Sequence, residues 1–207
     1  MSNQWAEENL KVIQTLMERS AIYRRALAPI MLLVGIIGLS SGIVGFLFDI
    51  NTPQKIAILW LGFGFLACVL AFLLIRIQAL KDKEPFFTPP AKRVINAIVP
   101  GIASGLILLI SLLVSSYENK FVFFMFPLLM IFYGLALHSA GFFMRRGIKL
   151  FGWVFVIIGC ILFMLTGLGM NFSGHKTIHL MVMGGFGVLH ILYGIYLFIT
   201  EKSGAQL

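Results

Sequence analysis

Three of the four histidines in the chain fall within one stretch, residues 174–194, which reads GHKTIHLMVMGGFGVLHILYG. His175 and His179 are four residues apart, so they face the same side of a helix, where a divalent metal ion could bridge them. Two ligands without a third nearby, and with Lys176 between them, are weak support for such a site. We therefore expect no cofactor, and keep His175 and His179 as weak candidates for metal ligands.

Composition identifies the elements that must position these histidines as membrane-spanning helices. Hydrophobic residues make up 59% of the chain and charged residues 12%, which is far from the balance of a soluble domain. Six stretches are apolar on every face and long enough to cross about 30 Å of hydrocarbon. The pattern predicts an all-α, polytopic membrane protein with six transmembrane helices. The expected spans are 27–48, 56–75, 97–117, 121–143, 150–171 and 180–199.

The basic residues predict how these spans are oriented. Of the 16 Lys and Arg residues, all but Lys55, Lys120 and Lys176 fall on the side that holds both termini. Because cytoplasmic loops carry the excess of Lys and Arg, we expect both termini inside (N-in/C-in) in a multi-pass protein of the bacterial inner membrane. The net charge of +8 follows from this topology and from attraction to anionic lipid, so we do not expect nucleic acid as a partner.

The transmembrane domain, residues 27–200, is flanked by two cytoplasmic segments. Residues 1–26 place apolar side chains at helical spacing, which predicts an amphipathic helix lying on the membrane surface. The first apolar run begins only after these 26 residues, and no small-residue cleavage pattern follows it, so the first span is not expected to be a signal peptide. A helix that binds a partner is the alternative for residues 1–26. Residues 201–207 form a short cytoplasmic tail.

A proline-rich elbow interrupts the domain at residues 81–96. Its prolines oppose helix formation, whereas the Thr followed by two prolines at 88–90 is a favourable helix start. We expect Phe86 and Phe87 to reach the lipid headgroup layer beside Lys92 and Arg93. The elbow then anchors the chain to the membrane surface, and the alternative is a docking site for a ligand or a protein.

The remaining candidates lie inside the spans. His138 and His190 fall on stripes of glycine, so they should face other helices and not lipid. Their expected depths differ by about 10 Å, which makes a single haem ligated by both awkward. We interpret them as hydrogen-bonded packing residues, and a polar interior that also includes Tyr133 and Tyr193 is the alternative.

Other small residues, and several absences, narrow the choice of function. The second span offers Gly64, Ala67, Cys68 and Ala71 for helix packing, and Cys68 and Cys160 both fall inside spans, where no disulfide is expected. No charged residue lies in the central part of any span, which argues against ion-coupled transporters and proton pumps. Nucleotide-binding loops, nucleophile elbows and HExxH motifs are absent from the sequence.

The chain resembles a family of small six-span bacterial inner-membrane proteins with no assigned activity. The resemblance rests on three segments, EPFFTPPAKRVINAIVPGIASG, MIFYGLALHSAGFFMRRGIKLFGWVFVIIGCILF and GGFGVLHILYGIY. It covers most of the chain, from about Arg19 to the last span. It implies location and architecture only, and no functional residue is carried over.

Three functions are compatible with these observations. The first is a non-enzymatic sensor, regulator or accessory subunit that acts through a membrane or cytoplasmic protein partner. The second is a permeation protein for a small uncharged or amphiphilic solute, lined by His138, His190, Tyr133 and Tyr193. The third is a haem- or metal-binding redox protein. The glycine stripes could also join two copies of the chain, so a homo-oligomer is left open.

Overall fold

The computed structural model describes residues 9–13, 27–81, 83, 87–114, 120–144, 146–169 and 174–204. The described part contains six helices that are long and apolar enough to cross a membrane, and no strand, which confirms the predicted all-α polytopic class. The first five spans are α2 (Ala28–Leu47), α3 (Pro53–Lys81), α4 (Pro89–Val114), α5 (Lys120–Ala140) and α6 (Arg146–Gly167). The sixth consists of α7 (His175–Val182), the π-helical η1 (Met183–Val188) and α8 (Leu189–Gly204).

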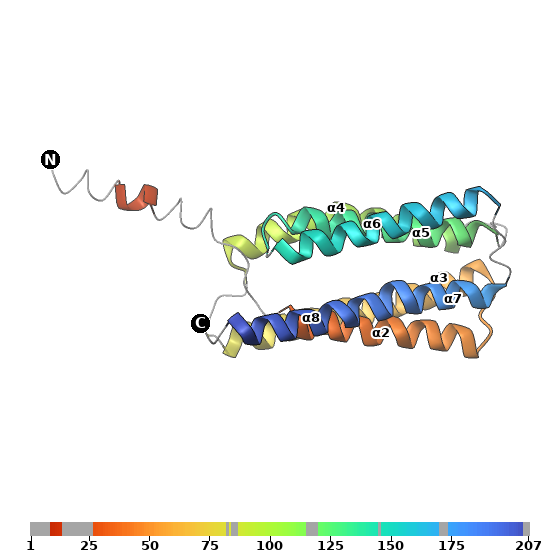
Figure 1. Ribbon diagram of the computed structural model, residues 1–207, viewed down its shortest axis with the longest axis horizontal. Helices are drawn as coiled ribbons and strands as arrows, with labels where there is room; N and C mark the ends of the chain where they lie inside the picture. Colours follow the sequence, from red (N-terminus) through yellow and green to blue (C-terminus); the bar gives the residue numbers. More distant parts are fainter. Residues whose placement is uncertain are drawn as a thin grey trace.

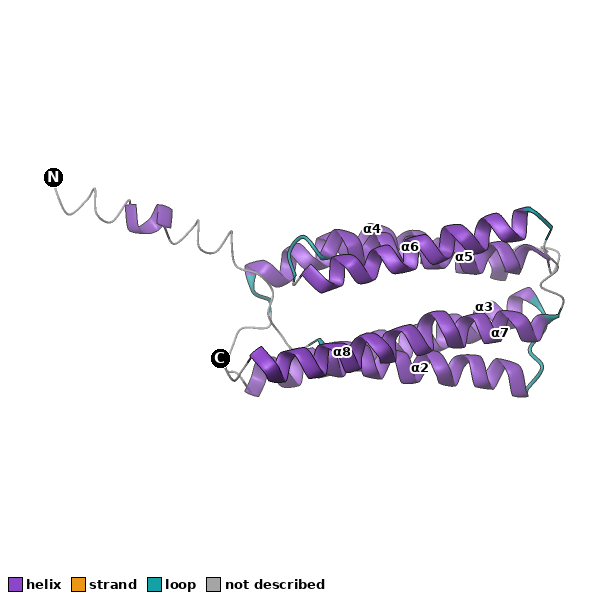
Figure 2. Cartoon of the chain, in the orientation of Figure 1, coloured by secondary structure: helices purple, strands orange, loops and turns teal. Residues whose placement is uncertain are grey.

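The six spans form two layers of three helices each (Figure 1). One layer contains α4, α5 and α6, and the other contains α2, α3 and the last span. Within the first layer α5 packs against both α4 and α6, and within the second α2 packs against α3 and along α7, η1 and α8. The described loops are short and lie at the two ends of the bundle (Figure 2). The surface shared by the two layers is therefore the interior of the protein.

Helix α4 begins at the helix start predicted for 88–90, before the expected span at 97–117. It starts at Pro89, so the second half of the predicted elbow at 81–96 is helical. Its first turn is capped by Thr88, whose Oγ1 accepts a hydrogen bond from the Ala91 N–H at 3.3 Å. The longer helix contains Pro100, which removes one backbone N–H from the ladder of hydrogen bonds. Of the predicted surface helix at 1–26, only residues 9–13 are described, and they are helical.

Glycines bring the helices within each layer into backbone contact. A Cβ atom added at Gly38 of α2 would lie 2.5 Å from the Phe186 carbonyl oxygen of η1, and one at Gly134 of α5 would lie 2.7 Å from the Gly152 carbonyl oxygen of α6. Such close approach is how helices associate in lipid, where burying apolar surface gives no gain. The same contact recurs along α2 and the last span, and along α5 and α6, at Gly35, Gly42, Gly187, Gly194, Gly141 and Gly159.

The small residues of α3 are not used in this way. No atom lies within 4 Å of a Cβ added at Gly64, and Cys68 is exposed. The packing stripe expected there is thus left uncovered by the described part of the chain. Gly62, on another side of α3, also has open space around it.

We predict that Gly134→Leu separates α5 from α6 and destabilises the protein, whereas Gly62→Leu is tolerated. A leucine at 134 has no room beside Gly152 and Phe155, and overpacking of this kind costs about 1–3 kcal/mol. The measurement is the midpoint of unfolding of each purified variant in mixed micelles with increasing sodium dodecyl sulfate. Equal midpoints for the two variants would show that the glycine contact does not hold these helices together.

Candidate functional site

A hydrogen bond between Tyr133 and His190 joins the two layers near the middle of the bundle. The Tyr133 hydroxyl oxygen and His190 Nε2 are 2.7 Å apart, and the His190 side chain is fully buried. Tyr133 lies 13 residues from the start of α5, which places it about 20 Å along the helix. The pair therefore lies well inside the membrane-spanning segment, where a polar side chain needs a partner inside the protein.

The π-helical turn explains why His190 faces α5. Gly185 and His190 are five residues apart, which would place them about 140° apart around an ordinary α-helix. In the structure both face the same layer, because Gly185 packs against Met130 and Phe126 while His190 binds Tyr133. A π-helix brings residues five apart to the same side, and such turns are frequent at functional sites.

Aromatic rings continue from this bond in both directions between the layers. Consecutive rings lie with their centroids 4.1–6.1 Å apart, in stacked, tilted or edge-to-face arrangements. We call this set the aromatic seam, and it consists of Trp60, Phe126, Phe186, Tyr133, Phe155, His190, Phe151, Tyr193 and Tyr196. Each such pair adds about 0.5–1.5 kcal/mol beyond the burial of its area, so the seam contributes substantially to holding the layers together.

Three of the four predicted interior residues meet in this seam. Tyr193 stacks on Phe151 at 4.1 Å, and Phe151 in turn contacts the ring of His190. His138 lies elsewhere, with its ring against Phe142 and Trp153. The structure therefore groups Tyr133, His190 and Tyr193, and no contact brings the two interior histidines together in the described part of the chain.

His179 is buried against α2. Its Nε2 is 2.8 Å from the carbonyl oxygen of Ile50, and its ring fills the space beside Gly45. The side chain of His175 lies outside the part of the chain that the structure describes. Among the described residues, no group of three or more His, Cys, Asp or Glu is close enough to hold a metal ion. A metal site at His175 and His179 stays a prediction, and would require the bond to Ile50 to be exchanged.

The elbow presents an open pocket at the start of α4. Phe87, Lys92, Ile95 and Asn96 line it, and its volume is about 400 Å³. Phe87 is 58% exposed and Lys92 is exposed, so an apolar and a cationic side chain lie together at this surface. Arg93 is half-buried, and Phe86 lies outside the described residues.

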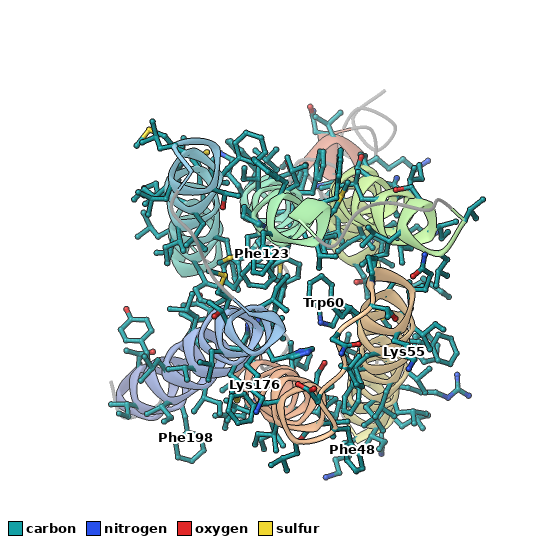
Figure 3. The ribbon with its side chains drawn as sticks, turned by 90° about the vertical axis from the view of Figure 1, so that its right-hand side faces the viewer. Phe48, Lys55, Trp60, Phe123, Lys176 and Phe198 are labelled. Carbon is teal, nitrogen blue, oxygen red and sulfur yellow. The ribbon has the colours of Figure 1, made fainter. Side chains whose placement is uncertain are left out.

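Sequence reasoning did not single out Trp60, which closes the seam near one end. Its ring reaches from α3 toward the middle of the bundle (Figure 3) and packs 5.9 Å from Phe126. The side chain is buried, and its Nε1 atom has no hydrogen-bond partner within the described part of the chain. A single tryptophan in an apolar run gives no pattern from which this position could be predicted.

Comparison of the chain with protein-family models, with curated proteins and with solved structures gives no match. The resemblance to a family of small six-span proteins therefore stays a prediction. Any functional assignment has to come from the geometry described above.

We predict that Tyr133→Phe destabilises the protein by about 1–2 kcal/mol, because it leaves His190 Nε2 buried without a partner. The matched control is His138→Phe, which keeps ring contacts with Phe142 and Trp153 and should change stability by less than about 0.5 kcal/mol. Unfolding titrations in mixed micelles measure both. Tyr133→Phe with wild-type stability would mean that the bond does not hold the layers together.

Proposed function

We propose that this integral membrane protein is a non-enzymatic sensor, regulator or accessory subunit that acts through a protein partner bound to α3 and α4. We also propose that it resides in a bacterial inner membrane with both termini in the cytoplasm. The distribution of Lys and Arg supports this orientation, since Lys55 and Lys176 lie at the end of the bundle that faces the viewer in Figure 3. Lys81 and Lys92 lie at the opposite end, where α3 ends and α4 begins.

The low burial of α3 and α4 is the observation that carries the proposal. Within the apolar window of each of these two spans 6% of the residues are buried, compared with 28–44% in the other four. The two spans are consecutive and pack on each other, so their uncovered surface is continuous. It includes large side chains such as Phe65 and Ile107, which are 73% and 67% exposed. A second membrane protein can cover such a surface, and close packing is what drives that association in lipid.

The open pocket at the elbow adds a polar element to the same pair of helices. Lys92 and Asn96 offer hydrogen-bond donors beside the apolar Phe87 and Ile95. Aromatic and cationic residues at the end of a span are suited to contact with a partner at the membrane surface. The elbow and the uncovered face together form a docking region for one partner.

We predict that a photo-crosslinking amino acid at Phe65 or Ile107 forms a discrete protein adduct in membranes, because these side chains face the proposed partner. The matched controls are Ile157 on α6 and Ile199 on α8, which are 52% and 61% exposed and should crosslink to lipid only. Adding Lys92→Glu should reduce the adduct at Ile107 by weakening the contact at the elbow. Mass spectrometry of the adduct separates a second copy of this chain from another protein. Lipid adducts alone at all four positions would contradict the proposal.

Permeation of a small uncharged solute is a second candidate, favoured by the Tyr133–His190 pair well inside the membrane-spanning segment between two layers. Transporters place their binding sites at such interfaces, next to irregular helices like η1. Tyr193 would extend the polar lining toward the end of the bundle where α8 terminates.

If this second function operates, His190→Ala should lower the flux of glycerol or urea into proteoliposomes several-fold, because the replaced ring lies in the seam between the layers. His138→Ala should leave the flux unchanged, since His138 contacts Phe142 and Trp153 and lies outside that seam. The measurement is the swelling rate in stopped-flow light scattering. Wild-type flux that does not exceed that of empty liposomes would remove permeation of these solutes from consideration.

A further inference from the structure

The first two turns of α4 project beyond the hydrocarbon of the membrane. The helix has 26 residues and is therefore about 39 Å long, whereas the hydrocarbon core is about 30 Å thick. Its only charged residues, Lys92 and Arg93, lie near its beginning, and the rest of the helix contains no Asp, Glu, Lys or Arg. The open pocket lined by Phe87, Lys92, Ile95 and Asn96 therefore lies at the depth of the lipid headgroups.

The surroundings of this pocket are cationic. Residues 76–96, which include the end of α3 and the start of α4, contain five Lys and Arg residues and two Asp and Glu residues. Lys92 and Asn96 are exposed and lie one turn apart on the same face of α4. Neither side chain forms a hydrogen bond or an ion pair within the described part of the chain. The complementary ligand is an anion that accepts hydrogen bonds, such as a phosphate group.

An uncovered apolar stripe runs from the pocket into the membrane along the same face of α4. Val99, Leu106 and Ile110 follow Lys92 by seven, fourteen and eighteen residues, so all three lie within about 40° of it around the helix. All three side chains are exposed. Leu106 lies about 15 Å beyond Asn96 along the helix axis, which is half the thickness of the hydrocarbon core. The pocket and the stripe together match a molecule with an anionic headgroup and an acyl chain.

We propose that this pocket binds the headgroup of an anionic phospholipid such as phosphatidylglycerol. The Lys92 ammonium group pairs with the phosphate, and the Asn96 side-chain amide donates a hydrogen bond to a phosphate oxygen. Phe87 and Ile95 pack against the carbon atoms of the glycerol backbone. One acyl chain then follows the apolar stripe of α4 into the leaflet.

This proposal deepens the docking region described above, because it assigns a lipid to the polar end of that region. It rests on the proposed function only in that both use the uncovered surface of α3 and α4. The protein partner is expected to cover Phe65 and Ile107, which do not line the pocket. A failure of crosslinking at those two positions would therefore leave the lipid site intact, and a failure of lipid binding would leave the partner site intact.

Native mass spectrometry of the full chain, released from detergent micelles, tests the lipid site. The probes are phosphatidylglycerol and phosphatidylcholine with the same two acyl chains, each added at increasing concentration. Phosphatidylglycerol should bind about tenfold more tightly, because the quaternary ammonium group of phosphatidylcholine opposes the charge of Lys92. Inorganic phosphate at millimolar concentration should not displace it, since the free anion lacks the acyl chain.

Two variants and a matched control identify the contacts. Lys92→Gln should weaken binding of phosphatidylglycerol about tenfold, because it removes a charge-assisted hydrogen bond. Asn96→Ala keeps the net charge and should weaken binding about threefold. Lys81→Gln removes the same charge at the same end of the bundle but outside the pocket, so screening should limit its effect to less than about twofold. All three side chains are exposed, so these changes leave the packed interior intact.

Four outcomes would overturn the proposal. Equal affinity for the two lipids would show that the pocket does not recognise an anionic headgroup. Displacement by inorganic phosphate would indicate a site for the free anion. Equal losses in Lys81→Gln and Lys92→Gln would mean that the attraction comes from the whole cationic end of the bundle and not from the pocket. Unchanged affinity in Asn96→Ala would likewise place the headgroup elsewhere.

Discussion

Backbone contact at glycine positions is the constraint on which the rest of this structure depends. Apolar side chains gain nothing by leaving lipid for the protein interior, so helices associate where their surfaces fit closely and where polar groups find partners. In this chain Gly38 against η1 and Gly134 against Gly152 provide that fit within each layer. The two layers are then held to each other by bulky rings and by one buried hydrogen bond, Tyr133 to His190. Contacts within each layer are therefore made by glycines, and contacts between the layers are made by large side chains.

The interior is filled unevenly. On the side of α5, α6 and the last span, the aromatic seam packs around His190 and leaves it no exposure. On the side of α3, small residues replace large ones, and Gly64 faces empty space. Helix α3 therefore contributes less to the packed interior than α2 and the last span do, with 6% of its apolar window buried compared with 39% in each of those two.

Hydropathy was sufficient to predict the six helices, and glycine spacing indicated packing faces on α5 and the last span but not which helices they contact. An apolar run of about 20 residues has one stable conformation in lipid, and glycines such as Gly134 and Gly187 lie where backbones meet. The partner of His190 could not be predicted, because the face of a residue was inferred from a constant 100° per residue and η1 departs from that rotation. The burial of His179 could not be predicted from its spacing either, because it depends on the position of the neighbouring helix α2. The role of Trp60 depends on contacts between distant segments and left no pattern in its own neighbourhood.

The last span is fixed at two separate points, and the π-helical turn lies between them. Near its beginning, His179 is tied to Ile50, and beyond η1, His190 is tied to Tyr133. Ile50 and Tyr133 belong to different layers, so His179 and His190 have to point in different directions around the last span. The six residues of η1, which are wound as a π-helix, change the rotation of the last span between these two points. Any sliding of one layer past the other would change this difference in direction first, so η1 is the place where relative movement of the layers would be converted into rotation of a helix.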